Sequence, residues 1–156
     1  MDYQQSFSER IKLSPAEDQL EIHYNSKPNT KIHKFGFDAT NDRLPAKFFF
    51  KINPFIRNRP DYIAIDKKAY FLEAKGCRDI AKFKIDDLKS YAKWSEFMPL
   101  SFFVFSTTFQ KTVQFSIHQL RTLISKKDYK IERYDDNNKE YYPVPFKDLL
   151  ALNKLK

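Results

Sequence analysis

The sequence predicts an α/β domain in which helices flank a central mixed β-sheet. Amphipathic helical segments alternate along the chain with short apolar runs typical of strands. Apolar residues make up 42% of the 156 residues, enough for a core that needs no disulfides. Two of the apolar runs, residues 61–65 and 69–75, flank a short polar turn. We therefore expect the order α–β–β–β–α–β–α, followed by a β-hairpin and a last helix.

The N-terminal third begins with residues 1–13, which are polar and are expected to be loosely ordered. Residues 14–24 form a predicted helix, because Ser14 suits the N-cap, Pro15 the first turn and Glu17 a capping box. Residues 25–30 are a predicted loop, and residues 31–45 fit no single element. The aromatic run KFFFKI at 47–52 predicts a strand.

The rest of the chain alternates more regularly. The hairpin at 61–75 precedes a predicted helix at 85–97, a buried strand at 100–107 and an amphipathic helix at 115–125. A hairpin around DDNN at 135–138 and a helix at 146–155 complete the chain. We expect one domain over 1–156, with a core at about 14–125 and an extension at about 126–156.

Composition narrows the class of protein. The net charge of +8 favours an anionic partner, most often nucleic acid, although a basic protein without such a partner is an alternative. The chain has only two glycines, too few for a glycine-rich phosphate-binding loop. The lone Cys77 allows no internal disulfide, and His23, His33 and His118 have no zinc-site spacing. Without a signal peptide or an apolar run of about 20 residues, the protein is expected to be soluble and cytoplasmic.

Three charged residues occupy unusual positions in the hairpin at 61–75, because strands seldom carry acids or lysines in their interior. Glu73 and Lys75 must share one face, since side chains alternate along a strand. A two-residue turn would place Asp61 opposite Ala74, on the other face. A three-residue turn at 66–68, or a bulge, would place Asp61 opposite Glu73.

Asp61 and Glu73 would repel each other if they were directly opposite. A divalent cation such as Mg²⁺ removes that penalty, because it binds carboxylate oxygens. Lys75, two residues beyond Glu73, could polarise an attacking water or neutralise charge on a phosphate. These are the parts needed to hydrolyse a phosphodiester.

Pro60-Asp61 followed by Glu73-Ala74-Lys75 resembles the motif of the PD-(D/E)xK nuclease superfamily, over about residues 14–107. The resemblance implies a restriction-endonuclease-like core and Mg²⁺-dependent cleavage of DNA, with Mn²⁺ as a possible substitute. It implies that Asp61, Glu73 and the carbonyl of Ala74 bind metal and that Lys75 is catalytic. Small members resemble junction resolvases, restriction enzymes and nucleases of phages or mobile elements, and a homodimer would supply a site for each strand.

Other residues have competing interpretations. Many members of the superfamily add an acid from the first helix, here Glu17 or Glu21, and we slightly favour Glu17 as a ligand and catalytic residue. One branch, the helicase-linked nucleases, has Gln-x-x-x-Tyr after the motif; here the positions hold Asp87 and Tyr91, and we interpret Tyr91 as a core residue.

Basic side chains around the motif could contact phosphates, or could form an ordinary solvated surface. The candidates are Arg57, Arg59, Lys82, Lys84, Lys89 and Lys93.

The sequence thus predicts a metal-dependent DNA endonuclease. The alternatives are a non-catalytic nucleic-acid-binding module with the same fold and a structural protein whose charge serves only solubility. The structure of the substrate, its base sequence and the choice between DNA and RNA stay open.

Overall fold

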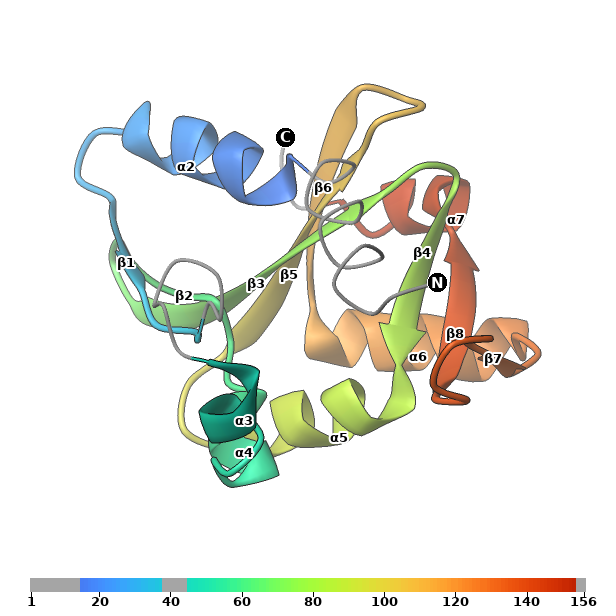
Figure 1. The fold of residues 1–156 in the computed structure, drawn as a ribbon. Helices are drawn as coiled ribbons and strands as arrows, with labels where there is room; N and C mark the ends of the chain where they lie inside the picture. The colour runs from blue at the N-terminus through green and yellow to red at the C-terminus, as the bar shows by residue number, and fades with distance from the viewer. Residues whose placement is uncertain (1–14, 38–44, 154–156) are drawn as a thin grey trace.

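The computed structural model describes residues 15–37 and 45–153. A five-stranded sheet crosses the molecule, with helix α2 on one face and helices α5 and α6 on the other (Figure 1). A smaller sheet packs on the same side as α5 and α6. This arrangement confirms the predicted mixed sheet flanked by helices.

The central sheet consists of β1 (Lys31–Lys34), β2 (Tyr62–Ile65), β3 (Ala69–Cys77), β5 (Leu100–Ser106) and β6 (Lys111–Ser116). The strands lie in the order β1-β2-β3-β5-β6. Only the β3–β5 pair is parallel, and the other three pairs are antiparallel. The parallel pair needs a crossover connection, which β4 and α5 provide.

The second sheet has the order β4-β8-β7 and is antiparallel throughout. It consists of β4 (Ile80–Lys84), β8 (Glu140–Pro145) and β7 (Glu132–Arg133). The predicted C-terminal hairpin is therefore present, and its strand β8 pairs with β4. Helix α7 (Phe146–Leu150) follows β8 directly, where the sequence predicted a longer helix over 146–155.

Three longer helices lie where the sequence predicted helices, although some of their boundaries differ from the predicted ones. Helix α2 spans Ala16–Asn25, α5 spans Ile85–Trp94 and α6 spans Ile117–Lys127. Pro15 is the N-cap of α2 and makes no side-chain cap, so the predicted start at Ser14, which lies outside the described residues, was wrong.

Helix α6 begins two residues later than predicted. Ser116 and Gln119 form a capping box there, and the residues before it complete strand β6.

The predicted strand at 47–52 is wrong. Residues Ala46–Phe49 form helix α3, and a second short helix, α4 (Pro54–Arg57), follows at once. The Asn53 side chain caps α4 by accepting a hydrogen bond from the Phe55 N–H at 2.9 Å. Three consecutive phenylalanines lack the alternation of a half-buried strand, and β1 already occupies the edge position beside β2. Strands β4 and β6 were not predicted.

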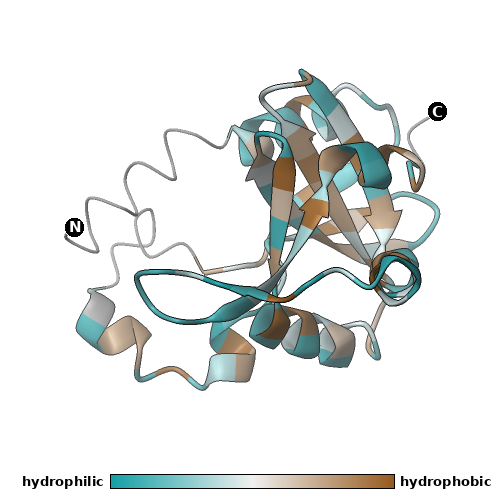
Figure 2. Ribbon diagram, turned by 90° about the vertical axis from the view of Figure 1, so that its right-hand side faces the viewer, coloured by the Kyte–Doolittle hydropathy of each residue, from teal (hydrophilic) through white to brown (hydrophobic). Residues whose placement is uncertain are grey.

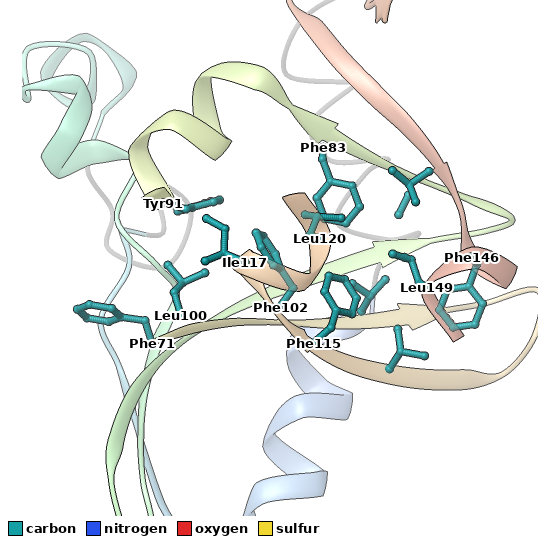
Figure 3. Close-up of a cluster of buried hydrophobic side chains, with 14 residues drawn as sticks. Phe71, Phe83, Tyr91, Leu100, Phe102, Phe115, Ile117, Leu120, Phe146 and Leu149 are labelled. Carbon is teal, nitrogen blue, oxygen red and sulfur yellow. The ribbon is translucent and has the colours of Figure 1, made fainter. Parts of the chain in front are cut away.

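Two hydrophobic clusters hold the central sheet between its layers. The larger lies between the sheet, α5, α6 and the second sheet, and it includes Phe71, Phe83, Phe102 and Phe115 (Figure 3). The smaller joins α2 to the opposite face. Apolar ribbon accordingly concentrates on the central strands, and hydrophilic ribbon on the loops (Figure 2). Among residues 15–37 and 45–153, no helix has the length and apolar character to cross a lipid bilayer.

Phe102 is the centre of the larger cluster, where its ring meets the rings of Phe83, Tyr91 and Phe115. We expect Phe102→Ala to lower the free energy of unfolding by about 3–5 kcal/mol, since it leaves a cavity among rings that cannot all collapse. Urea denaturation measures this. Phe50→Ala, at an exposed position, should change stability by less than about 0.5 kcal/mol. Equal losses for both variants would contradict this account of the core.

Candidate active site

The turn between β2 and β3 sets the position of the acidic residues. Ile65 pairs with Ala69 and Tyr62 pairs with Leu72, so the turn contains residues 66–68. The Lys68 N–H donates to the Asp66 side chain at 3.0 Å, which closes the turn locally. This is the three-residue turn that the sequence left open as one alternative, and its register brings Asp61 opposite Glu73.

One backbone hydrogen bond links Asp61 to Glu73, and a second links Asp61 to Ala74, the residue after Glu73. The Asp61 N–H donates to Glu73 Oε2 at 3.1 Å, and the Ala74 N–H donates to Asp61 Oδ2 at 3.0 Å. Tyr91, from α5, donates its hydroxyl to Glu73 Oε1 at 2.6 Å. Both carboxyl groups are thus oriented by neighbouring backbone and by one buried tyrosine. We call Asp61 and Glu73 the acid pair.

Gly36 fixes the backbone at Asp61 from the other side. The N–H groups of Phe35 and Gly36 donate to the Asp61 carbonyl at 2.7 and 2.9 Å. A Cβ atom at position 36 would lie 3.0 Å from Asp61 Cα and 3.3 Å from Asp61 Oδ1. A side chain there would be in tight contact with Asp61, which would have to shift by a few tenths of an ångström, so glycine favours this close approach. Sequence reasoning missed this residue, because a lone glycine has no motif spacing.

The surroundings of the acid pair disfavour two negative charges. Burial is the main reason that the pKa of Asp61 is raised to about 7; the charge of Glu17 acts in the same direction, and the Ala74 hydrogen bond and Lys75 oppose the rise. Burial and the charge of Asp61 raise the pKa of Glu73 well above its ordinary value. The Tyr91 hydrogen bond and Lys75 partly offset that rise. The metal-free site therefore resists full ionisation near neutral pH.

Lys75 lies on the strand face of Glu73, as alternation along β3 requires. Its ammonium nitrogen is 5.5 Å from the centroid of the Phe83 ring, and its charge favours ionisation of both members of the acid pair. The structure therefore brings Asp61, Glu73 and Lys75 together. Asp87 is also close enough for its charge to raise the pKa of Glu73.

The two candidate acids on α2 differ in their surroundings. Glu17 forms an ion pair with Lys34 at 3.9 Å and influences Asp61 through its charge. Glu21 accepts a hydrogen bond from the Tyr62 hydroxyl at 2.8 Å. Within residues 15–37 and 45–153, no three acidic, histidine or cysteine side chains are arranged to share one ion. A ligand role for Glu17 stays a prediction.

Tyr91 has a larger part than the sequence indicated. Its ring is buried against Phe102 in the core, as expected, but its hydroxyl reaches the acid pair. The signal for it was the spacing of Asp87 and Tyr91 on the helix after the motif. One turn of helix places both near Glu73, so both belong to the surroundings of the site.

The predicted basic residues lie in four separate places. Arg59 stacks over the rings of Phe35 and Phe37, at 4.7 and 4.0 Å from their centroids, directly before the acid pair. Arg57 lies over the rings of Phe49 and Phe50 in the α3–α4 segment.

The four predicted lysines follow the acid pair in the sequence and lie near two other elements. Lys82 and Lys84 lie over the Tyr134 ring beside the second sheet. Lys89 lines a cavity of about 490 Å³ between α5 and α6, and Lys93 is exposed on α5. These residues do not form one continuous group with the acid pair.

The donor set at the acid pair fits a hard divalent cation such as Mg²⁺. Two partly buried carboxyl groups, linked through the Asp61 and Ala74 N–H groups, offer oxygen ligands from neighbouring strands. Bound positive charge would also reverse the penalty that raises both pKa values. Proteins commonly bind Mg²⁺ through one or two carboxylates, while the ion keeps several of its water ligands.

Comparison with known proteins places few constraints on the chain. No family model matches it, and no curated protein matches it in sequence. It is similar to a solved structure described as a nuclease from a fusselovirus, with a TM-score of 0.44 and 9% identity, over 93% of this chain and 82% of that one. A similarity this low carries no conclusion about activity, which has to follow from the arrangement of Asp61, Glu73 and Lys75.

The raised pKa of Asp61 predicts how stability depends on pH without metal. The folded protein holds a proton that the unfolded chain releases above about pH 4, so the stabilisation is complete below pH 4 and is lost as pH rises through about 7. Thermal melts in EDTA should therefore show falling stability across this interval. Asp61→Asn should flatten the dependence and raise the melting temperature at pH 8.

Asp86→Asn is the matched control, because Asp86 is an exposed acid at the start of α5. It should leave the pH dependence of the native protein in place. A native protein whose stability rises from pH 4 to pH 7, or an Asp61→Asn variant with an unchanged slope, would contradict the description of the acid pair.

Proposed function

We propose that this protein is a metal-dependent nuclease that hydrolyses phosphodiester bonds in DNA at the site of Asp61, Glu73 and Lys75. The observation that carries the proposal is the pairing of two partly buried carboxyl groups, each with a raised pKa, with a lysine on the same strand face. Such a group is costly to stability unless a cation and an anionic substrate complete it. The arrangement also agrees with the PD-(D/E)xK motif that the sequence resembles.

Asp61 and Glu73 would hold the metal ion, with Mg²⁺ the first candidate and Mn²⁺ a substitute. When bound, such an ion supplies Lewis-acid polarisation of a phosphoryl oxygen and offsets charge that grows on it. The Tyr91 hydroxyl and the Ala74 N–H keep the two carboxyl groups in place while the ion binds. The carbonyl of Ala74 and the carboxylate of Glu17 are further candidate ligands.

Lys75 would act on the substrate. Its ammonium group can donate hydrogen bonds to a phosphate oxygen or to the attacking water, and its charge offsets the negative charge of the transition state. The oxygen of water forms a bond to phosphorus as the bond to one sugar oxygen breaks. One proton of the water ends on the departing sugar oxygen, so the products are a phosphate end and a hydroxyl end.

DNA is the proposed substrate because the chain has a net charge of +8 and the acid pair follows a basic stretch that includes Arg57 and Arg59. A homodimer would provide one site for each strand of a duplex.

A second candidate is a nucleic-acid-binding module that does not cleave. It is favoured by the fact that both Glu73 oxygens already accept hydrogen bonds within the protein.

A cleavage assay separates these candidates. Supercoiled plasmid and labelled duplex, junction, flap and single-stranded DNA are incubated with Mg²⁺, Mn²⁺ or EDTA. We expect cleavage only with metal, and a loss of at least about a hundredfold in Asp61→Asn, Glu73→Gln and Lys75→Met. DNA binding should survive in all three variants, because the arginines and remaining lysines are unchanged.

Lys67→Met is the control for Lys75→Met, because Lys67 is an exposed lysine in the turn of the same hairpin. It should cleave as the native protein does. Binding without metal-dependent cleavage of any substrate would favour the non-catalytic module. Cleavage at the native rate by Asp61→Asn would exclude this site.

Tyr91→Phe tests the orientation of the acid pair without disturbing the ring packing. Losing the hydroxyl should raise the pKa of Glu73 further, since the hydrogen bond favours the ionised carboxylate. We therefore expect the acidic limb of the pH–activity profile to move to higher pH, and Mg²⁺ to bind more weakly. Both are measured by initial rates against pH and metal concentration. Tyr141→Phe, which loses a hydroxyl bonded to Glu132, should leave the profile in place.

A further inference from the structure

The segment between β1 and β2 has an unusual composition for a surface connection. Residues 45–60, PAKFFFKINPFIRNRP, contain four cations and four phenylalanines and no acidic residue. The segment folds into α3 and α4 at the periphery, where Figure 2 shows apolar ribbon. Large apolar side chains gathered on a protein surface usually mark a binding site.

Exposed rings and cations are paired along this segment. The side chain of Phe50 is 57% exposed and that of Phe48 is 46% exposed. The Arg57 guanidinium lies 5.2 Å from the Phe50 centroid, and Lys47 and Lys51 lie 5.0 and 5.6 Å from the Phe48 centroid. Each exposed ring therefore has a positive charge beside it.

Helix α5 anchors the segment and adds another ring. Trp94 stacks on Phe55 at 4.6 Å, with the planes 11° apart, and its Nε1–H donates to the Phe55 carbonyl at 3.2 Å. Phe97, whose ring is 5.9 Å from that of Trp94, is 69% exposed. We call Phe48, Phe50, Arg57 and Phe97 the aromatic–basic platform.

The platform and the acid pair are connected through the same elements. Arg57 precedes Asp61 by four residues, which limits their separation to roughly 14 Å. Tyr91, which donates to Glu73, lies one turn before Trp94 on α5. Arg59, stacked over Phe35 and Phe37, lies between the two groups along the chain. A nucleic acid with its phosphate at Lys75 would have its neighbouring nucleotides within reach of the platform.

We infer that the aromatic–basic platform binds unpaired nucleotides, so that the substrate of the proposed nuclease has a single-stranded segment next to the cleaved phosphate. Exposed rings stack on base faces, which a duplex hides between its base pairs, and the adjacent cations match one phosphate for each base. The absence of acidic residues from 45–60 suits a polyanion and not a mixed-charge protein surface. The inference rests on the proposed function for the cleavage step, whereas the binding step can be tested independently.

Binding is measured with Asp61→Asn as the background, so that no substrate is cut. Fluorescence anisotropy compares a labelled single strand of about 20 nucleotides with a blunt duplex of equal length. Adding Phe50→Leu and Phe97→Leu keeps apolar side chains but removes both rings. We expect the single strand to bind at least about tenfold more weakly, and the duplex to change by less than about twofold. Phe50→Trp should retain single-strand binding.

Trp94 provides a second readout, because it is the only tryptophan in the chain and contacts Phe97. Its emission should change on addition of unlabelled single strand, and this change should be reduced in the double leucine variant. Ile22→Ala, at an exposed apolar position on α2 across the sheet, is the control and should alter neither signal. Melting curves verify that each variant is folded.

Three results would overturn the inference. In the first, the double leucine variant binds the single strand as tightly as the background does. In the second, its affinities for the single strand and for the duplex fall equally. In the third, the substitutions change the oligomeric state and leave nucleic-acid binding intact. The last would make the platform an interface between copies of the chain. Failure of the proposed function appears separately, as native cleavage by Asp61→Asn and Lys75→Met or as no cleavage by the native protein, while the binding result stands.

Discussion

The candidate site depends on the register of the β2–β3 hairpin, which a three-residue turn determines. The turn pairs Ile65 with Ala69, so Asp61 is opposite Glu73 on the face toward α5. A slip by one residue would move Asp61 to the face that packs against α2. The aromatic cluster around Phe71 and the contacts of Gly36 with Asp61 both require the observed register, and therefore the core and the site stabilise the same pairing.

Folding alone gives little reason to keep two carboxyl groups at this place. Their burial and mutual repulsion disfavour the ionised forms, and an apolar pair would pack with less cost. The surrounding groups nevertheless orient both carboxyl groups, as the Tyr91 hydroxyl and the Ala74 N–H do. Polar groups that are held in a defined geometry at a cost in stability are typical of a functional site. The conflict is local, because the cores on either side of the sheet are apolar.

Aromatic residues have two distinct uses in this chain. Phe83, Phe102 and Phe115 pack in the core with edge-to-face and stacked contacts. Phe83 also lies beside Lys75, and Phe102 beside Tyr91. Phe50 and Phe97 point outward, beside cations or at the end of α5. Helix α5 connects the two uses, since its Tyr91 and Trp94 contact the acid pair and the α3–α4 segment.

The sequence by itself determined the elements with strong periodicity: α2, α5 and α6, the buried strand β5, and the hairpin whose alternation puts Glu73 and Lys75 on one face. Local patterns are sufficient there, because side-chain periods of 3.6 and 2 follow from backbone geometry. The turn length, the helical state of residues 46–49, the pairing of β8 with β4, and the contacts of Gly36 and Tyr91 with the acid pair were decided only by the tertiary structure. Each depends on partners far apart in the sequence, whose positions no local pattern contains.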